Sequence, residues 1–179
     1  MSQNQKIINR FMPPREVEWR SDYIRREEIY KNRNDKVYIF GDNIQEKGGG
    51  GMAGEMRGEI NTVGIPTKKT PTMKDDAFFT DNEFSYNIYF IFKAFLKIPK
   101  QRDLVVPRNI GKGLSKLDTK APRTYKYLTN LLSSLVDGRF SWIDDLSNTK
   151  EGLAIYAIHS YLLNNRVLPN IDALIPKIR

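Results

Sequence analysis

Four consecutive glycines at residues 48–51 constrain this chain more than any other stretch. Before them, residues 37–40 (VYIF) have the unbroken β-branched and aromatic composition of a buried strand. After them, residues 52–59 are predicted to form a short helix. Glycine lets the backbone approach a ligand closely and reach positive φ, and the free N–H groups at a helix start attract anions. The stretch is therefore predicted to bind phosphate.

A second loop of the same kind follows another short apolar run. Residues 104–107 are predicted to form a buried strand that ends in proline, and residues 108–113 carry two glycines. Strands alternate with helices along the chain, which predicts an α/β domain with a central sheet. Ligands of such sheets collect at the carboxyl ends of the strands. Because both glycine loops follow strands, we expect them to lie side by side over one site.

The spacing of the glycines argues against two common nucleotide-binding motifs. Gly49, Gly51 and Gly54 match the pattern G-x-G-x-x-G, but any run of four glycines produces this match easily. The glycines also begin several residues after the strand, whereas the dinucleotide turn is tight. In the P-loop pattern, Glu55 and Met56 would stand where Lys and Ser/Thr are required. A Walker-type NTPase is therefore not expected, and a flexible surface loop is the alternative to a phosphate site.

The length and composition indicate one globular domain. A chain of 179 residues that is 40% hydrophobic has enough apolar material for one core. We predict an N-terminal arm over residues 1–15, the main domain over residues 16–138, and a helical C-terminal extension over residues 139–179 that packs on it. The chain has no cysteine and one histidine, His159, which excludes thiolate and multi-histidine metal sites. We expect neither a metal nor a cofactor.

The net charge and the lack of targeting signals bear on partners and location. The formal net charge is +8, which favours polyanionic partners such as nucleotides and nucleic acids. A solvated basic surface is the alternative interpretation. No stretch approaches the roughly 18 apolar residues that a membrane span needs, and the first residues lack the apolar segment of a signal peptide. We expect a cytoplasmic protein without a membrane partner.

Residues 48–56 (GGGGMAGEM) resemble the glycine-rich loop and helix start of macrodomains, which are ADP-ribose-binding α/β/α modules. In that family the loop follows a strand that ends in an asparagine-containing turn, and residues 41–43 (GDN) stand in that place here. Residues 104–113 (LVVPRNIGKG) are similar to the second, phosphate-wrapping loop. The chain also resembles a group of phage and bacterial proteins with a VFIFGDN…GGxAG…GIPTK pattern. The resemblance covers roughly residues 17–136 and implies a three-layer α/β/α fold with a mixed sheet.

The resemblance also implies roles for individual residues. Asn43 would approach the distal ribose. Residues 41–43 depart from the usual small-residue pair before the asparagine, and Asp42 adds a carboxylate near the ligand, so that Asp42 and Asn43 would be the catalytic residues of a hydrolase. Asp22, after the first strand, would accept a hydrogen bond from the adenine amino group or would instead cap a helix. The two loops would hold the diphosphate through Gly48, Gly49, Gly50, Gly51, Met52, Asn109, Ile110, Gly111, Lys112 and Gly113.

Three functions are open at this stage. The first is binding of ADP-ribose or a related nucleotide, with recognition or hydrolysis of ADP-ribose on a macromolecule. Hydrolysis would use Asp42 as a base, or the amine of Lys47, Lys68 or Lys112 as a nucleophile of lowered pKa. The alternative for Asp42 is a passive acceptor that orients the ribose hydroxyls, and the alternative for each lysine is a surface charge that attracts phosphate. The second function is a non-catalytic inhibitor or adaptor that binds a protein or nucleic acid through residues 139–179. The third is sequence-tolerant binding of nucleic acid.

Overall fold

A four-stranded parallel sheet forms the centre of the fold. The computed structural model describes residues 16–95, 97–99 and 102–137 of the chain. The strands in this part are β1 (Val17–Arg20), β2 (Lys36–Asn43), β3 (Thr62–Lys68) and β4 (Asp103–Pro107), in the spatial order β1-β4-β2-β3. All three pairs of neighbouring strands are parallel. The predicted α/β class is therefore confirmed.

The strand directions differ from the mixed sheet that the resemblance implied. The described strands all run parallel, and the antiparallel pairing found beside them is an isolated bridge between Lys68 and Phe78. Parallel neighbours need crossover connections, which place helices against the faces of the sheet. The predicted arm at residues 1–15 and the predicted extension at residues 139–179 lie outside the described residues.

The sheet buries apolar side chains on both faces. Successive residues of a strand point to opposite faces, so a strand covered on both sides has no polar alternation. In β2, Val37 and Ile39 join the larger core cluster, whereas Tyr38 and Phe40 join the smaller one. The central strand β4 divides in the same way. This double burial explains the unbroken apolar runs in the two central strands.

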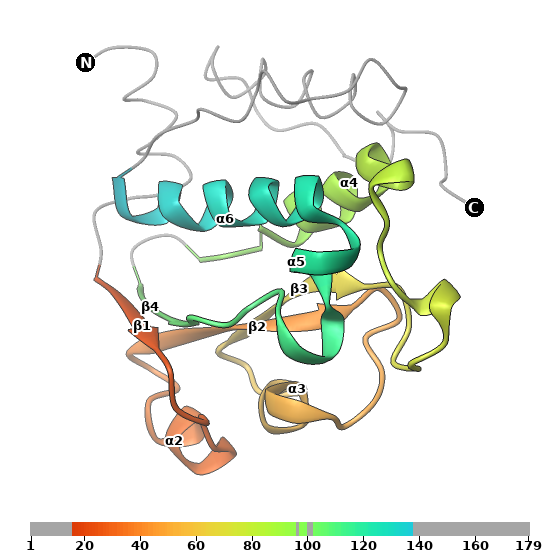
Figure 1. Ribbon diagram of the computed structural model, residues 1–179. Coiled ribbons are helices and arrows are strands. Elements are labelled where there is room, and N and C mark those ends of the chain that lie inside the picture. Colours follow the sequence, from red (N-terminus) through yellow and green to blue (C-terminus); the bar gives the residue numbers. More distant parts are fainter. Residues whose placement is uncertain (1–15, 96, 100–101, 138–179) are drawn as a thin grey trace.

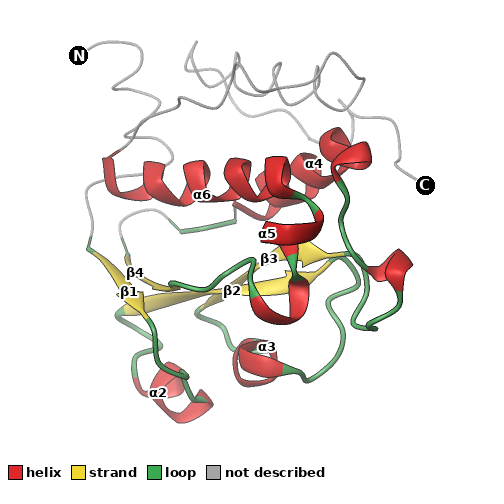
Figure 2. Ribbon diagram, viewed as in Figure 1, coloured by secondary structure: helices red, strands yellow, loops and turns green. Residues whose placement is uncertain are grey.

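Helices cover the two faces and complete three layers. One face carries α4 (Phe84–Phe95), α5 (Leu117–Lys120) and α6 (Pro122–Asp137), and the opposite face carries α2 (Arg26–Lys31) and α3 (Gly51–Met56) (Figures 1 and 2). The larger core cluster lies under α4 and α6, and the smaller one includes Ile29 of α2 and Met56 of α3. Among the described helices, none is long and apolar enough to cross a membrane.

The start of α6 is held by a residue that is distant in the sequence. Asp81 lies in a 3₁₀ turn before α4. Its carboxylate accepts hydrogen bonds from the backbone N–H groups of Arg123 (2.8 Å) and Thr124 (3.0 Å). Free N–H groups of a first helical turn need such acceptors. Asp81 therefore joins the 3₁₀ turn to α6.

Candidate functional site

The two glycine loops line one cleft at the carboxyl ends of β2, β3 and β4. The cleft has two adjoining lobes, of about 280 Å³ and about 120 Å³. The first lobe lies between the loops and is lined by Gly50, Gly51, Met52 and residues 109–115 among others. The second lobe lies beyond Leu114 and is lined by Asp42, Asn43, Lys47, Gly48, Arg57, Thr67, Lys68 and Pro71 among others. Most of the predicted site residues therefore come together, whereas Gly49 and Asp22 line neither lobe.

Leu114 marks the boundary between the lobes and lines both of them. A Cβ atom added to Gly50 would lie 3.7 Å from Cδ1 of Leu114, so the two loops are within contact distance. The side chain is 60% exposed although it is apolar. The sequence did not single out Leu114, because an isolated leucine after a glycine carries no motif. Its position places an exposed apolar side chain where the two lobes adjoin.

Backbone N–H groups on both sides of the first lobe have no acceptor among the described residues. In the first loop these are the N–H groups of Gly50, Gly51 and Met52. In the second loop Ile110 donates to Pro107 O (3.3 Å) and Lys112 donates to Asn109 O (2.9 Å), so these two donors are occupied. The remaining donors of that loop are the N–H groups of Asn109, Gly111 and Gly113. Unpaired N–H groups on facing loops are suited to binding an anion.

The first glycine loop is shaped by its contact with α3. This helix spans six residues, fewer than the eight that the sequence predicted, so its dipole adds little to anion binding. Gly48 has φ +89°, a conformation that residues with a side chain rarely adopt. Gly54 lies against Gly49, and a Cβ atom on Gly54 would come within 2.5 Å of the Gly49 carbonyl oxygen. Glycine at residue 54 therefore lets the loop fold back onto the helix.

Asp42, which the sequence offered as a base or as an acceptor for ribose hydroxyls, is buried and forms an ion pair. Its Oδ1 accepts from Nη2 of Arg57 and from the backbone N–H of Asn43 (2.8 Å). Nη1 of Arg57 also donates to the carbonyl oxygen of Gly48. The register of β2 against β3 shifts between Asp42 and Asn43, as is common where a strand re-aims a side chain. Asp42 thus fixes Arg57, and Arg57 fixes the first loop.

Asn43 closes a turn. Its Nδ2 donates to the carbonyl oxygen of Lys47 (2.7 Å), and the Lys47 N–H donates to its Oδ1 (3.4 Å). Asn side chains often bond the neighbouring backbone in this way. The residue is buried and borders the second lobe, but both ends of its amide already have partners. The predicted catalytic role of Asn43 therefore has less support than a role in shaping the turn.

Asp22 lies apart from the cleft and is paired with Arg20. Nε and Nη2 of Arg20 donate to its two carboxylate oxygens, at 2.7 Å and 2.6 Å. These hydrogen bonds lower the pKa of Asp22 to about 2. The cap position of α2 is Arg25, and no side-chain cap bond is present there. The alternative role of Asp22 as a helix cap is therefore wrong, and both oxygens that would accept from an adenine amino group already have a partner.

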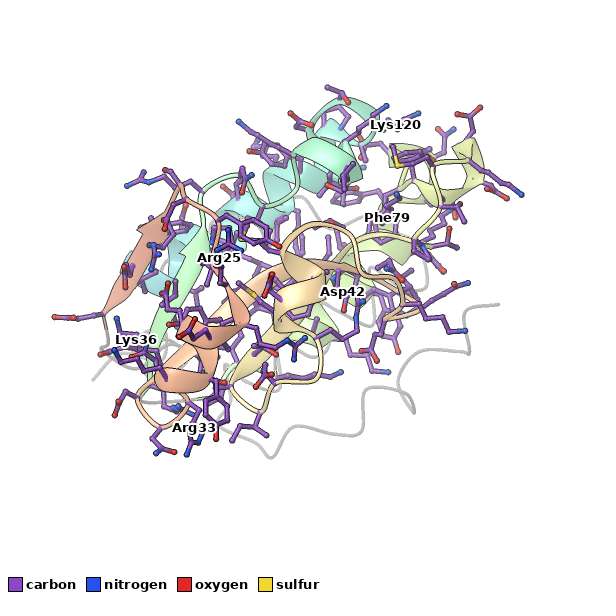
Figure 3. The ribbon with its side chains drawn as sticks, turned by 90° about the horizontal axis from the view of Figure 1, so that it is seen from below. Arg25, Arg33, Lys36, Asp42, Phe79 and Lys120 are labelled. Carbon is purple, nitrogen blue, oxygen red and sulfur yellow. The ribbon has the colours of Figure 1, made fainter. Side chains whose placement is uncertain are left out.

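Lys68 is the one of the three candidate lysines that is buried. Lys47 and Lys112 are exposed, whereas Lys68 is 7% exposed and borders the second lobe. Burial, together with the charge of Lys116, lowers the pKa of Lys68. Lys68 is the last residue of β3. Figure 3 views the face covered by α2 and α3, with Asp42 near its centre and Lys36 and Arg33 toward its edge.

Arg57 is a site residue that sequence reasoning missed. Its position after the helix that follows the glycine run is the only signal the sequence offers, because its partners depend on how α3 turns. Within the described part of the chain, no group of three or more His, Asp or Glu side chains converges as a metal site would. The polar groups that line the cleft are mainly backbone N–H groups and basic side chains.

Residues 19–131 match the model of a family of unknown function (DUF7831). The chain belongs to this family. The segment shared with the DUF7831 model runs from β1 into α6 and includes both glycine loops, Arg57 and Lys68. No curated protein and no solved structure matches the chain.

Proposed function

We propose that this protein binds ADP-ribose or a closely related nucleotide diphosphate in the two-lobed cleft. The observation that carries the proposal is the pair of facing loops with free backbone N–H groups on each side of the first lobe. A diphosphate has many acceptor oxygens and needs several donors fixed in advance. The resemblance to macrodomains supplies the identity of the nucleotide, and the three-layer fold is compatible with that resemblance.

The charge of the cleft suits a diphosphate. Four basic residues line the two lobes, namely Lys47, Arg57, Lys68 and Lys112, against one acidic residue, Asp42. Because Asp42 is paired with Arg57, it neutralises one of these charges. The remaining positive charge attracts a phosphate-rich ligand. In this arrangement the diphosphate occupies the first lobe and the attached sugar extends into the second.

Proline at residue 50 tests the N–H groups directly. Gly50 has φ −75° and ψ 142°, which proline adopts without strain, and proline removes the N–H. Calorimetry with ADP-ribose should show affinity falling about tenfold in Gly50→Pro, since a charge-assisted hydrogen bond is lost. Gly50→Ala keeps the N–H and places its Cβ in ordinary contact with Leu114, so it is the matched control. Absence of ADP-ribose binding by the unaltered protein at millimolar concentration would refute the proposal.

A release assay distinguishes a protein that only recognises ADP-ribose from one that also removes it. The ion pair with Arg57 leaves Asp42 poorly placed to act as a base, so the geometry favours recognition over hydrolysis by this carboxylate. Incubating the protein with an ADP-ribosylated peptide and an ADP-ribosylated DNA oligonucleotide measures release of the sugar. We expect bound ligand without release through Asp42, and release that is lost in Asp42→Asn at unchanged affinity would overturn that expectation.

A further inference from the structure

Lys68 is a buried lysine with no carboxylate partner among the described residues. It ends β3, is 7% exposed and borders the second lobe. Its Nζ lies 3.3 Å from Sδ of Met73 and 4.8 Å from the centre of the Phe78 ring. A thioether sulfur and a ring face are weak partners for an ammonium group compared with a carboxylate or phosphate. Buried charges in proteins are normally paired. The ammonium group of Lys68 is therefore suited to binding an anion.

A second lysine approaches the same place. Nζ of Lys116 is 5.8 Å from the centre of the Phe78 ring, and its charge acts on Lys68. Lys116 has a left-handed backbone, with φ 47° and ψ 29°, at the junction between the second glycine loop and α5. It forms no ion pair with a described carboxylate. The ammonium groups of Lys68 and Lys116 thus both approach the Phe78 ring, and their charges repel one another.

The neighbouring charges do not compensate this pair. Lys120 also approaches the Phe78 ring, at 4.5 Å, but it has Asp75 at 3.9 Å. Asp42, the acidic residue of the second lobe, is engaged by Arg57. Neither carboxylate therefore balances Lys68 and Lys116. An oxyanion between the two ammonium groups would supply the missing charge and would remove their mutual repulsion.

We propose that Lys68 and Lys116 form an oxyanion-binding site at the β3 side of the second lobe, which takes a phosphate or carboxylate group. This site is separate from the N–H groups of the first lobe. The lysine site rests on the proposed function in one respect. If the diphosphate of the ligand occupies the first lobe, the ligand carries a further anionic group beyond the sugar, and the lysines bind that group. The site itself is defined by the two lysines, whichever nucleotide fills the cleft.

Nuclear magnetic resonance with the full chain tests the site, using inorganic phosphate as the probe. Saturable shifts of the side-chain Cε signals of Lys68 and Lys116 are expected. Lys116→Gln should weaken the phosphate affinity at these signals about tenfold, because one charged donor is lost. The matched control is Lys74→Gln, which replaces an exposed lysine of the loop after β3. This variant should keep the phosphate affinity within about twofold of the unaltered protein. Because Lys116 is exposed, its replacement is compatible with folding even where Lys68→Gln is not.

The same titration separates this site from the proposed function. Phosphate that shifts only the amides of residues 49–52 and 109–113 would overturn the lysine site and support the first-lobe clamp. Shifts of the lysine signals without any response of those amides would support the lysine site and count against the clamp. Equal affinity in Lys116→Gln and the unaltered protein would show that the two lysines do not act together. Acetate in place of phosphate then assigns the group: competition by acetate indicates a carboxylate site, and its failure indicates a phosphate site.

Discussion

The carbonyl oxygen of Gly49 lies 2.5 Å from the position that a Cβ atom would take on Gly54. This contact joins the first glycine loop to the helix that follows it, α3. Cβ atoms essentially never approach a carbonyl oxygen so closely, so any side chain at residue 54 must move the loop. The relationship links a helical residue that borders no lobe to the shape of the cleft.

Gly54→Ala should therefore destabilise the protein although alanine is the better helix former. In an exposed helix, alanine is favoured over glycine by about 1 kcal/mol. The clash with Gly49 should reverse that sign and lower the free energy of unfolding by about 1–3 kcal/mol, measured by urea denaturation. Gly49→Ala is the control, since its Cβ would have no atom within 4 Å, and we expect a change within about 0.5 kcal/mol. A stabilised Gly54→Ala variant would contradict the contact.

The ion pair between Arg57 and Asp42 should contribute far more to stability than a surface pair. The side chains are 23% and 6% exposed, so Arg57→Ala leaves a buried carboxylate without its partner. We expect the free energy of unfolding to fall by about 3 kcal/mol, at the lower end for a buried pair because Arg57 is partly exposed. Lys36→Ala removes the exposed pair with Glu18 and should cost less than about 1 kcal/mol. Equal losses in the two variants would show that burial does not set the difference.

The Arg57→Lys variant tests whether a positive charge at this position is sufficient for stability and for ADP-ribose binding. The guanidinium contacts Gly48 O through Nη1 and Asp42 through Nη2, and a single ammonium group cannot reproduce this planar pair of donors. Stability should be partly restored relative to Arg57→Ala, because the charge on Asp42 is again balanced. Affinity for ADP-ribose should stay low, because the first loop is no longer held. Full recovery of affinity in calorimetry would show that the contact with Gly48 has no part in binding.

The sequence predicted the strands and loops of this fold better than the partners of its polar residues. Apolar runs at residues 37–40 and 104–107 mark the central strands because both faces of the sheet are covered, and that burial leaves a direct trace in the sequence. The two glycine loops follow these strands, so their meeting in one cleft follows from the parallel topology. The strands and loops could therefore be predicted because burial and local backbone geometry determine them.

Polar partners depend on the three-dimensional path of the chain and could not be predicted in the same way. Asp42 pairs with Arg57 only because α3 returns the chain toward the end of β2. Asp81 has the sequence pattern of a cap for α4, yet its carboxylate reaches α6, 42 residues away. Asp22 was predicted to contact the ligand or to cap a helix, but its carboxylate accepts hydrogen bonds from Arg20, two residues before it. In each case several groups could serve as the hydrogen-bond partner of the carboxylate, and the sequence does not indicate which of them lies nearest in space.

The pairing of Asp22 with Arg20 should show in its titration. The pKa of Asp22 is lowered from an ordinary 3.8 to about 2, chiefly by hydrogen bonds from Arg20. A lowered carboxyl pKa means that the contribution of the pair to stability is complete above about pH 4 and is lost as the pH falls through about 2. Carboxyl-carbon resonances should give a midpoint near 2, and Arg20→Gln should return it toward 3.8. A midpoint near 3.8 in the unaltered protein would show that the pair does not persist in solution.

Leu114 should affect ligand binding without affecting stability. Its side chain is 60% exposed, so Leu114→Ala should change the free energy of unfolding by no more than about 0.5 kcal/mol. The same side chain borders both lobes and reaches the opposite loop at Gly50, so its loss opens the cleft to water where the lobes adjoin. Affinity for ADP-ribose in calorimetry should fall about fivefold, in line with the loss of one apolar contact that excludes water. Ile60→Ala, which removes an 83% exposed side chain that lines neither lobe, should leave the affinity unchanged, and equal affinities in the two variants would remove Leu114 from the site.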